Sequence, residues 1–169
     1  MIRKAIEEDS KEIALLIIRS WKKAYRGLIP DDFLDNMSME NIEKNWKKNI
    51  ISQNDKNSIF VYEERDKIHG VIRFGEPLDK ENRRYNAEIH VLYVEPTLKR
   101  KGIGSRLFNF AKEYFIRYGK NNLIIWCLKG NEQGMNFYKK MGGKIVLTRK
   151  STVNNIEVEE VGFEFKFAE

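Results

Sequence analysis

The sequence predicts one α/β domain built around a mixed sheet, and three observations lead to this class. Apolar residues recur at helical spacing in several segments, and short β-rich runs alternate with those segments along the chain. No linker or change of composition divides the 169 residues. A chain of this length buries about 70% of the surface that its unfolded form exposes. We therefore expect a single domain over residues 1–169.

Two helices are expected in the first third of the chain. Asp9 or Ser10 is suited to cap the first helix, which should run to about residue 24. Pro30 should open a brief helical turn, and Ser38 is suited to cap a second helix that ends near residue 50. The first helix carries one apolar stripe for the core, formed by Ile13, Leu16, Ile17, Trp21 and Ala24.

Strands are expected in seven segments that are rich in β-branched and aromatic residues: 2–5, 59–63, 68–74, 87–94, 123–128, 144–149 and 156–167. The spacing of the second and third segments suits a hairpin, and the last two should pair in the same way across residues 151–155. Residues 75–86 read as a loop, and apolar spacing predicts further helices at 102–118 and 131–140.

Composition narrows the classes of function. Hydrophobic residues at 41% and charged residues at 33% are typical of a globular protein rather than of a disordered chain. The longest apolar run, residues 13–18, is far shorter than the ~20 residues that cross a bilayer, and no secretion signal is evident, so we expect a cytoplasmic protein without a membrane partner. One cysteine, Cys127, and two histidines, His69 and His90, predict no disulfide and no metal.

A basic glycine-containing turn lies between the strand at 87–94 and the helix at 102–118. The first turn of a helix leaves about four amide hydrogens unpaired and carries roughly half a positive charge. Gly102 and Gly104 keep side chains away from this backbone, and Lys99, Arg100 and Lys101 can neutralise a pyrophosphate. The turn lacks the third glycine of the dinucleotide fingerprint and the lysine of the Walker loop. Another phosphate carrier is therefore expected.

Residues 99–104 resemble the acyl-coenzyme A signature of the Gcn5-related N-acetyltransferase (GNAT) family, Gln/Arg-x-x-Gly-x-Gly/Ala, with Lys99 at the first position. Residues 131–143 are similar to the family's second motif, Asn-x-x-Ala-x-x-Phe-Tyr-x-x-x-Gly-Phe, with Gly134 and Gly143 replacing alanine and phenylalanine. The resemblance covers residues 87–143. It implies a GNAT-like single domain, with a mixed, mostly antiparallel sheet of about seven strands flanked by about four helices.

The resemblance also implies the reaction and its cofactor. An acetyl group would pass from acetyl-CoA to an amine of a small molecule or peptide by direct attack, without a covalent enzyme intermediate. Tyr138 would give a proton to the departing sulfur, and a half-buried core tyrosine is the alternative that the motif makes less favoured. Glu88, or less favourably His90, would take the proton of the amine; both residues lie on one strand face, and polar residues on a solvated face are the alternative.

Binding residues follow from the same resemblance. The strand is expected to end in a bulge whose amides bind the cofactor arm and the thioester oxygen, at Leu92, Tyr93 and Val94. Asn131 would bind the cofactor or cap its own helix. The remaining cofactor-binding residues would be those of the basic turn and the helix start, Lys99, Arg100, Lys101, Gly102, Ile103, Gly104 and Ser105. The acceptor pocket would be built by Trp21, Tyr25, Arg26, Leu28 and Ile29.

Several alternatives remain open at this stage. Asp31, Asp32 and Asp35 could attract a cationic amine or could simply cap a helix. The same fold could hold acyl-CoA as a non-catalytic sensor. A nucleic-acid protein would rest on the net charge of +6 and on residues 83–84 and 99–101, but no recognised basic module appears, so we expect no nucleic-acid partner. The terminal hairpin could pair with a second copy to form a homodimer.

Overall fold

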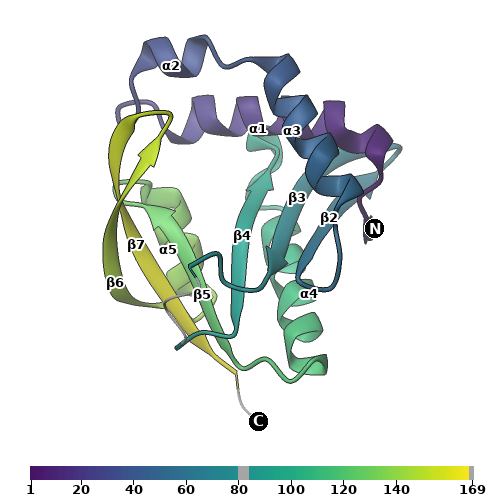
Figure 1. Cartoon of the computed structure of the whole chain (residues 1–169), viewed down its shortest axis with the longest axis vertical. Helices are drawn as coiled ribbons and strands as arrows, with labels where there is room; N and C mark the ends of the chain where they lie inside the picture. Colours follow the sequence, from purple (N-terminus) through teal and green to yellow (C-terminus); the bar gives the residue numbers. More distant parts are fainter. Residues whose placement is uncertain (80–83, 168–169) are drawn as a thin grey trace.

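Figure 1 shows the computed structural model of the chain, which describes residues 1–79 and 84–167, with helices packed on a central sheet. Residue 83, part of the basic pair considered above, and part of the expected 75–86 loop lie outside the described residues. The elements in chain order are β1 (Ile2–Lys4), η1 (Glu7–Asp9), α1 (Ser10–Ala24), α2 (Asp31–Asp35), α3 (Met39–Ile51), β2 (Asn57–Glu64), β3 (Lys67–Gly75), β4 (Ala87–Val94), η2 (Pro96–Leu98), α4 (Ile103–Arg117), β5 (Asn122–Leu128), α5 (Glu132–Lys140), β6 (Lys144–Val153) and β7 (Ile156–Lys166).

The seven strands form one sheet in the order β1-β2-β3-β4-β5-β7-β6. Strands β4 and β5 are parallel, and every other neighbouring pair is antiparallel. This confirms the predicted single α/β domain with a mixed, mostly antiparallel sheet. The described residues form five α-helices rather than about four, because the turn after Pro30 closes into the short helix α2.

The helices cover the two faces of the sheet. Helices α1 and α3 pack on one face against a core that includes Ile59, Val61 and Val71. Helix α4 packs on the other face through Leu107 and Phe108, and α5 contributes Tyr138 to the same core. The apolar stripe expected on α1 is confirmed in its first three positions, since Ile13, Leu16 and Ile17 are buried. None of the described helices has the length and apolar character required to cross a bilayer.

The predicted N-terminal cap is correct for one helix and wrong for another. Ser38 caps α3, because its side chain accepts a hydrogen bond from the amide of Asn41 at 3.2 Å. The cap expected from Asp9 or Ser10 is wrong: Asp9 stands at the N-cap of α1 but makes no capping bond there. Its carboxylate instead accepts from the amide of Ile6 and from the guanidinium of Arg3.

The C-terminal hairpin is longer and tighter than the sequence indicated. Strand β6 continues to Val153 instead of ending near residue 149. The turn consists of Asn154 and Asn155, whose φ angles of 47° and 68° are left-handed. Asparagine tolerates this conformation better than most residues, which allows a two-residue connection.

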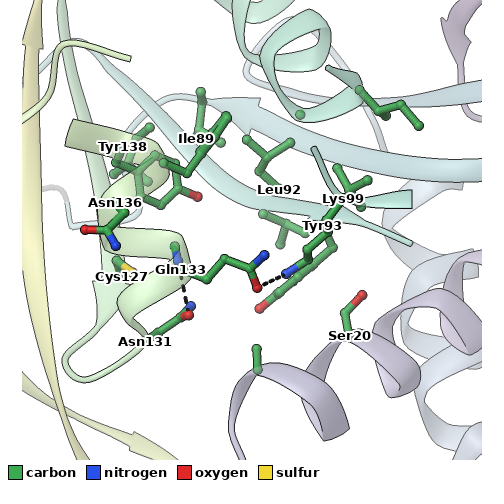
Figure 2. A pocket seen from close by; sticks show the side chains of 18 of the residues that line it. Ser20, Ile89, Leu92, Tyr93, Lys99, Cys127, Asn131, Gln133, Asn136 and Tyr138 are labelled. Atoms are coloured by element: carbon green, nitrogen blue, oxygen red, sulfur yellow. Dashed lines mark hydrogen bonds between the residues drawn. The ribbon is translucent and has the colours of Figure 1, made fainter. Parts of the chain in front are cut away.

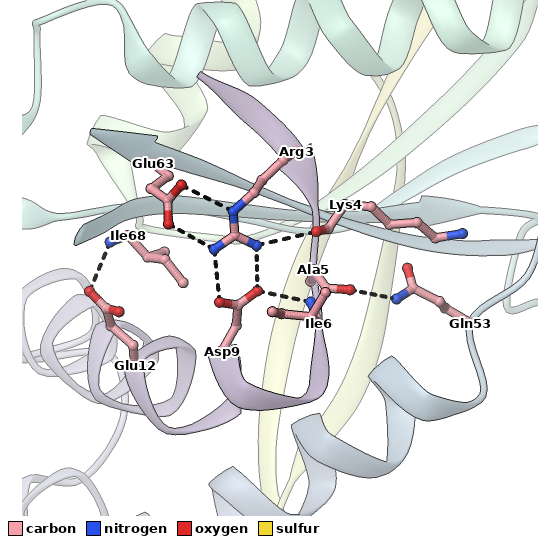
Figure 3. A network of polar contacts seen from close by, with 9 residues as sticks. All are labelled: Arg3, Lys4, Ala5, Ile6, Asp9, Glu12, Gln53, Glu63 and Ile68. Carbon is pink, nitrogen blue, oxygen red and sulfur yellow. Dashed lines mark hydrogen bonds and ion pairs between the residues drawn. The ribbon is translucent and has the colours of Figure 1, made fainter. Parts of the chain in front are cut away.

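An ionic network around Arg3 ties β1 to its surroundings (Figure 3). The guanidinium donates to both carboxylate oxygens of Asp9, at 2.7 and 2.9 Å, and to both of Glu63, at 2.9 and 3.1 Å. Asp9 precedes α1 and Glu63 lies in β2. Hydrogen bonds to the two carboxylates raise the pKa of Arg3 and lower that of Glu63. The network therefore holds β1, β2 and the start of α1 together.

Strands β4 and β5 are paired only at their beginnings. The parallel register joins Ala87 to Leu123 and Glu88 to Ile124. Beyond these pairs, residues from Ile89 of β4 and from Ile125 of β5 line a common cavity, so the two strands separate there. The separation leaves backbone groups along one edge of β4 without a strand partner and opens the sheet at its centre.

Candidate active site

Two cavities meet where β4 and β5 separate. The larger has a volume of about 790 Å³ and extends from this gap to the starts of α4 and α5. The smaller, of about 300 Å³, lies beside α1 and α3 and reaches β6 and β7. We call them the first and the second cavity. Both are lined by the same six residues at their junction: Tyr25, His90, Val91, Tyr93, Trp126 and Leu128.

The start of α4 forms one end of the first cavity. Gly102 has a φ of 81°, a left-handed conformation that favours glycine, and no side chain caps the helix. The first amides of α4 are therefore available to a ligand. A Cβ at Gly104 would lie 3.4 Å from the Phe137 ring, about van der Waals contact, so the backbone here already lies close to α5. This uncapped helix start fits the pyrophosphate of a coenzyme A molecule.

Most of the predicted cofactor-binding residues line the first cavity. Leu92, Tyr93 and Val94 line it from β4, whose free edge faces the gap. The turn and the helix start contribute the next group, and α5 contributes its N-cap residue: Lys99, Arg100, Gly102, Ile103, Gly104, Ser105 and Asn131. Lys101, also predicted, is not among the lining residues.

Figure 2 shows two polar contacts among the residues that line this cavity. The ammonium of Lys99 donates to Gln133 Oε1 at 3.0 Å, which joins the basic turn to α5. Burial lowers the pKa of Lys99. The side chain of Asn131 accepts a hydrogen bond from the amide of Gly134 at 3.2 Å. Asn131 therefore caps α5, which is one of the two roles that the sequence suggested for it. Gln133 was not anticipated, because its only sequence signal is its place in the second motif.

The bulge in β4 lies earlier than expected. Arg73 of β3 pairs with Val91, and the next residue, Phe74, pairs with Ile89, so His90 is the extra residue. The expectation of a bulge at residues 92–94 is therefore wrong, because Leu92 and Tyr93 stay paired with β3. His90 and Val91 line both cavities at this point.

His90 is held as a neutral imidazole. Its side chain is 3% exposed, and burial lowers its pKa to about 4. Nε2 lies 2.8 Å from the carbonyl oxygen of Glu76. Since a carbonyl only accepts, Nε2 carries the proton and Nδ1 keeps its lone pair. Nδ1 is buried and has no hydrogen-bond partner among the described residues.

Glu88 is placed differently from His90, although the two side chains share a strand face. Its Oε2 lies 3.8 Å from His90 Nε2 and accepts from the amide of Leu78 at 2.7 Å. Burial raises the pKa of Glu88. Glu88 is not among the residues that line either cavity. Its carboxylate thus lies behind the imidazole rather than in the open space.

Tyr138 projects from α5 into the first cavity (Figure 2). Its ring packs on Phe163 and Phe137, with centroid separations of 5.5 and 5.4 Å, which fixes its orientation. Burial raises the pKa of its hydroxyl well above the ordinary value, so the hydroxyl stays protonated at neutral pH. Within the described part of the chain this hydroxyl makes no hydrogen bond. It can therefore donate to a bound group.

Cys127 also lines the first cavity. Its side chain is buried, and burial raises the pKa of the thiol to about 12. A thiol with this pKa holds almost no thiolate at neutral pH, which disfavours a role as nucleophile.

The predicted acceptor residues divide into two groups. Trp21, Tyr25 and Ile29 line the second cavity. Arg26 and Leu28 do not: Arg26 pairs with Asp31 and Asp35 at the surface, and Leu28 packs over Gly130. Sequence reasoning missed further lining residues that come from distant segments, namely Trp46, Trp126, Ser151, Val153, Val158 and Glu160.

A central sheet opened between two parallel strands, with an uncapped glycine-bounded helix start at one end of the gap, has the form of an acyl-CoA-binding site. Residues 17–143 match the model of the Acetyltransferase (GNAT) family, and the chain belongs to this family. Acetyl-CoA is the cofactor of GNAT acetyltransferases, and the chain carries the fold and the sequence motifs of an acetyltransferase.

Individual relatives agree with this assignment. The chain is 26% identical to the uncharacterized N-acetyltransferase YuaI of Bacillus subtilis, over 95% of this chain and 90% of that protein. It is also 26% identical to the spermidine N(1)-acetyltransferase of Thermoplasma acidophilum, over 85% and 88% of the two chains. Among solved structures, the PaiA N-acetyltransferase of Thermoplasma acidophilum, in complex with coenzyme A, has the same fold, with a TM-score of 0.80, 21% identity, and coverage of 99% and 98%.

Proposed function

We propose that this protein transfers an acetyl group from acetyl-CoA to an amine of a small molecule or peptide by direct attack. The observation that carries the proposal is the meeting of two cavities at six shared residues, which provides one space for the donor and one for the acceptor. When bound, acetyl-CoA supplies an acyl carbon activated as a thioester. The amine nitrogen gains the acetyl group and loses a proton, and the coenzyme leaves as its thiol.

Two protons have to be moved, and two side chains are suited to move them. The Tyr138 hydroxyl lines the first cavity in its protonated form and donates to the sulfur as it departs. The neutral imidazole of His90 lies at the junction, and the lone pair of its buried Nδ1 would take the proton of the amine through a water molecule. Glu88 acts as a positioning residue that holds the loop beside the imidazole through the amide of Leu78. The protonated thiol of Cys127 supports a path without a covalent enzyme intermediate.

The alternative is a sensor that binds acyl-CoA without turnover. Such a protein needs the first cavity but has no use for a second cavity that joins it at the reacting end. Calorimetry with coenzyme A, followed by a thiol-release assay with acetyl-CoA and a broad panel of amines, separates the two. Tight binding with no thiol release from any amine would favour the sensor, and absence of binding would refute both.

Substitution of Tyr138 by phenylalanine tests the proton donor. We expect kcat to fall about 10²-fold or more, because general acid catalysis contributes on that scale, while coenzyme A affinity stays within twofold. Tyr118→Phe is the matched control, since Tyr118 is exposed at the end of α4 and lines neither cavity. Equal rates in the two variants would remove Tyr138 from the reaction.

Parallel substitutions compare the two candidates for the base. Glutamine at position 90 can still donate to the Glu76 carbonyl but offers no basic nitrogen. We expect His90→Gln to lower kcat by about 10²-fold and Glu88→Gln to lower it less, because only His90 lies at the junction. Thiol release at saturating acetyl-CoA gives both values. A larger loss in Glu88→Gln would reverse the assignment.

Location and assembly also belong to this proposal. We place the protein in the cytoplasm, where a free thiol such as that of Cys127 persists. We also propose that the protein forms a homodimer, because β6 is an edge strand of the sheet and exposes Ile145 and Val146. Sedimentation velocity reports the oligomeric state directly.

A further inference from the structure

We infer that the acceptor is a monocationic amine that carries an aromatic group, and not a polyamine; this inference rests on the proposed function. It comes from the lining of the second cavity.

Aromatic side chains form much of that lining. The chain has three tryptophans, and Trp21, Trp46 and Trp126 all line the second cavity, from α1, α3 and β5. Tyr25 and Tyr93 join them, and their hydroxyls lie 2.9 Å apart. Aromatic faces bury an apolar body and also attract one ammonium group. The volume of about 300 Å³ is at the small end of ligand pockets, so it suits a single small ring system.

The negative charge in the second cavity is already neutralised by a neighbouring arginine. Among the described lining residues Glu160 is the carboxylate, and Arg149 Nε donates to its Oε1 at 3.1 Å. The Arg149 guanidinium carbon also lies 3.9 Å from the centre of the Trp126 ring. This pair brings no net charge to the wall. A polyamine has two or more ammonium groups, and each needs water or a carboxylate when it is buried.

The acidic cluster at α2 does not supply the missing charge. Asp31 and Asp35 are more than half exposed and pair with Arg26. Neither they nor Asp32 are among the residues that line the two cavities. Their carboxylates therefore lie outside the space in which the acceptor would be held.

The junction fixes the orientation of such an amine. His90 and Val91 line both cavities, so the amine nitrogen lies there while the apolar body fills the aromatic part of the second cavity. Burial of that body contributes binding free energy at roughly 25 cal/mol per Å² of apolar surface, without requiring a second charge.

The test compares amines of the two classes in the thiol-release assay. We expect kcat/KM for 2-phenylethylamine and tryptamine to exceed that for putrescine and spermidine at least tenfold. Equal or better turnover of spermidine would overturn the inference and leave the proposed function standing.

A binding measurement covers the case in which no amine is acetylated. Tryptophan fluorescence of the protein saturated with coenzyme A is expected to change saturably with 2-phenylethylamine and little with spermidine. If 2-phenylethylamine binds but no amine is acetylated, the inference about the pocket holds and the proposed function fails. If coenzyme A binds and 2-phenylethylamine does not, the inference is overturned.

Two variants connect the preference to the second cavity. Trp21 lines this cavity and not the first, so Trp21→Leu should raise KM for 2-phenylethylamine at least tenfold while coenzyme A affinity stays within twofold. The control replaces Asp31, Asp32 and Asp35 together by asparagine and should change neither value. A loss of amine transfer in the control variant, with coenzyme A affinity intact, would locate acceptor recognition at α2 instead.

Discussion

The environment of His90 makes folding stability depend on pH. Burial lowers its folded pKa to about 4 from the ordinary 6.5, so between these values the unfolded chain binds more protons than the folded one. The free energy of unfolding is unaffected by protonation of this residue above pH 6.5 and decreases as the pH falls toward 4. The decrease is up to roughly 3 kcal/mol, at 1.36 kcal/mol per pKa unit. His90→Gln should therefore flatten the decline of unfolding free energy between pH 6.5 and 4.

Urea denaturation at several pH values measures this effect. At pH 8 the difference between the variant and the parent protein reports only the altered packing, so it serves as the internal control. The raised pKa of Glu88 acts in the opposite sense, since the folded protein then binds more protons than the unfolded chain above pH 4.5. Comparing the two proteins cancels that contribution. If the difference in unfolding free energy between the two proteins does not change with pH, His90 has the same pKa in the folded and the unfolded protein.

At the scale of secondary-structure elements, the two ends of α4 offer a matched pair of glycines. Gly102 and Gly119 have φ angles of 81° and 70°, and a Cβ at either position would meet no atom within 4 Å. Alanine in the left-handed region costs about 1 to 2 kcal/mol at each site. Only Gly102 lies in the first cavity. We therefore expect Gly102→Ala and Gly119→Ala to destabilise the fold similarly, and Gly102→Ala alone to weaken coenzyme A binding.

Chemical denaturation and calorimetry with coenzyme A provide the two measurements. A coenzyme A affinity that is unchanged in both variants would mean that the start of α4 does not contact the cofactor. Weaker binding in both variants would instead point to a general loosening of the helix.

One of the two replacements in the second motif, Gly143, has a packing explanation that the sequence does not contain. The family motif ends in phenylalanine, where this chain has Gly143. A Cβ at Gly143 would lie 2.6 Å from the Phe165 ring and 2.9 Å from the Tyr138 carbonyl oxygen. Phe165 of β7 therefore fills the adjoining space, and glycine lets the two segments approach. Such a contact joins residues far apart in the chain, so a local pattern does not reveal it.

Most elements of the fold could be predicted because each has its own periodicity. Helices α1, α4 and α5 and the strands follow from local spacing, and the second motif predicted Tyr138 in the first cavity. The bulge at His90 was misplaced, since a bulge depends on the register with β3 rather than on the strand's own residues. The ranking of Glu88 above His90 as the base came from the family resemblance, and it stays a prediction that the parallel substitutions test.

At the scale of the whole molecule, the second cavity was the part least accessible to sequence reasoning. Its walls come from α1, α3 and four strands, and the C-terminal hairpin contributes Glu160 and Ser151. These residues meet only because β7 pairs with β5 and carries β6 outward. Alternation along β7 predicts a strand but does not say which neighbour it joins.

The Arg3 network is expected to set the stability of the whole chain, because it joins β1 at the edge of the sheet to α1 and β2. Asp9 is 7% exposed and accepts three hydrogen bonds, two of them from the Arg3 guanidinium. Hydrogen bonds to charged groups contribute about 1.5 to 3 kcal/mol, so Asp9→Ala should lower the free energy of unfolding by roughly 2 to 3 kcal/mol. Glu63→Ala should have a smaller effect, since that carboxylate is more exposed.

A double-mutant cycle separates this ion pair from general packing. Arg3→Met and Asp9→Ala, measured singly and together by urea denaturation, should be strongly non-additive, because each single variant already removes the same bonds. Asp9→Asn keeps an acceptor for the Ile6 amide, so it should recover part of the loss caused by Asp9→Ala. Additive effects would mean that the guanidinium and the carboxylate contribute independently. The start of α1 would then be held by apolar contacts, such as those of Ile13 and Leu16 with the sheet.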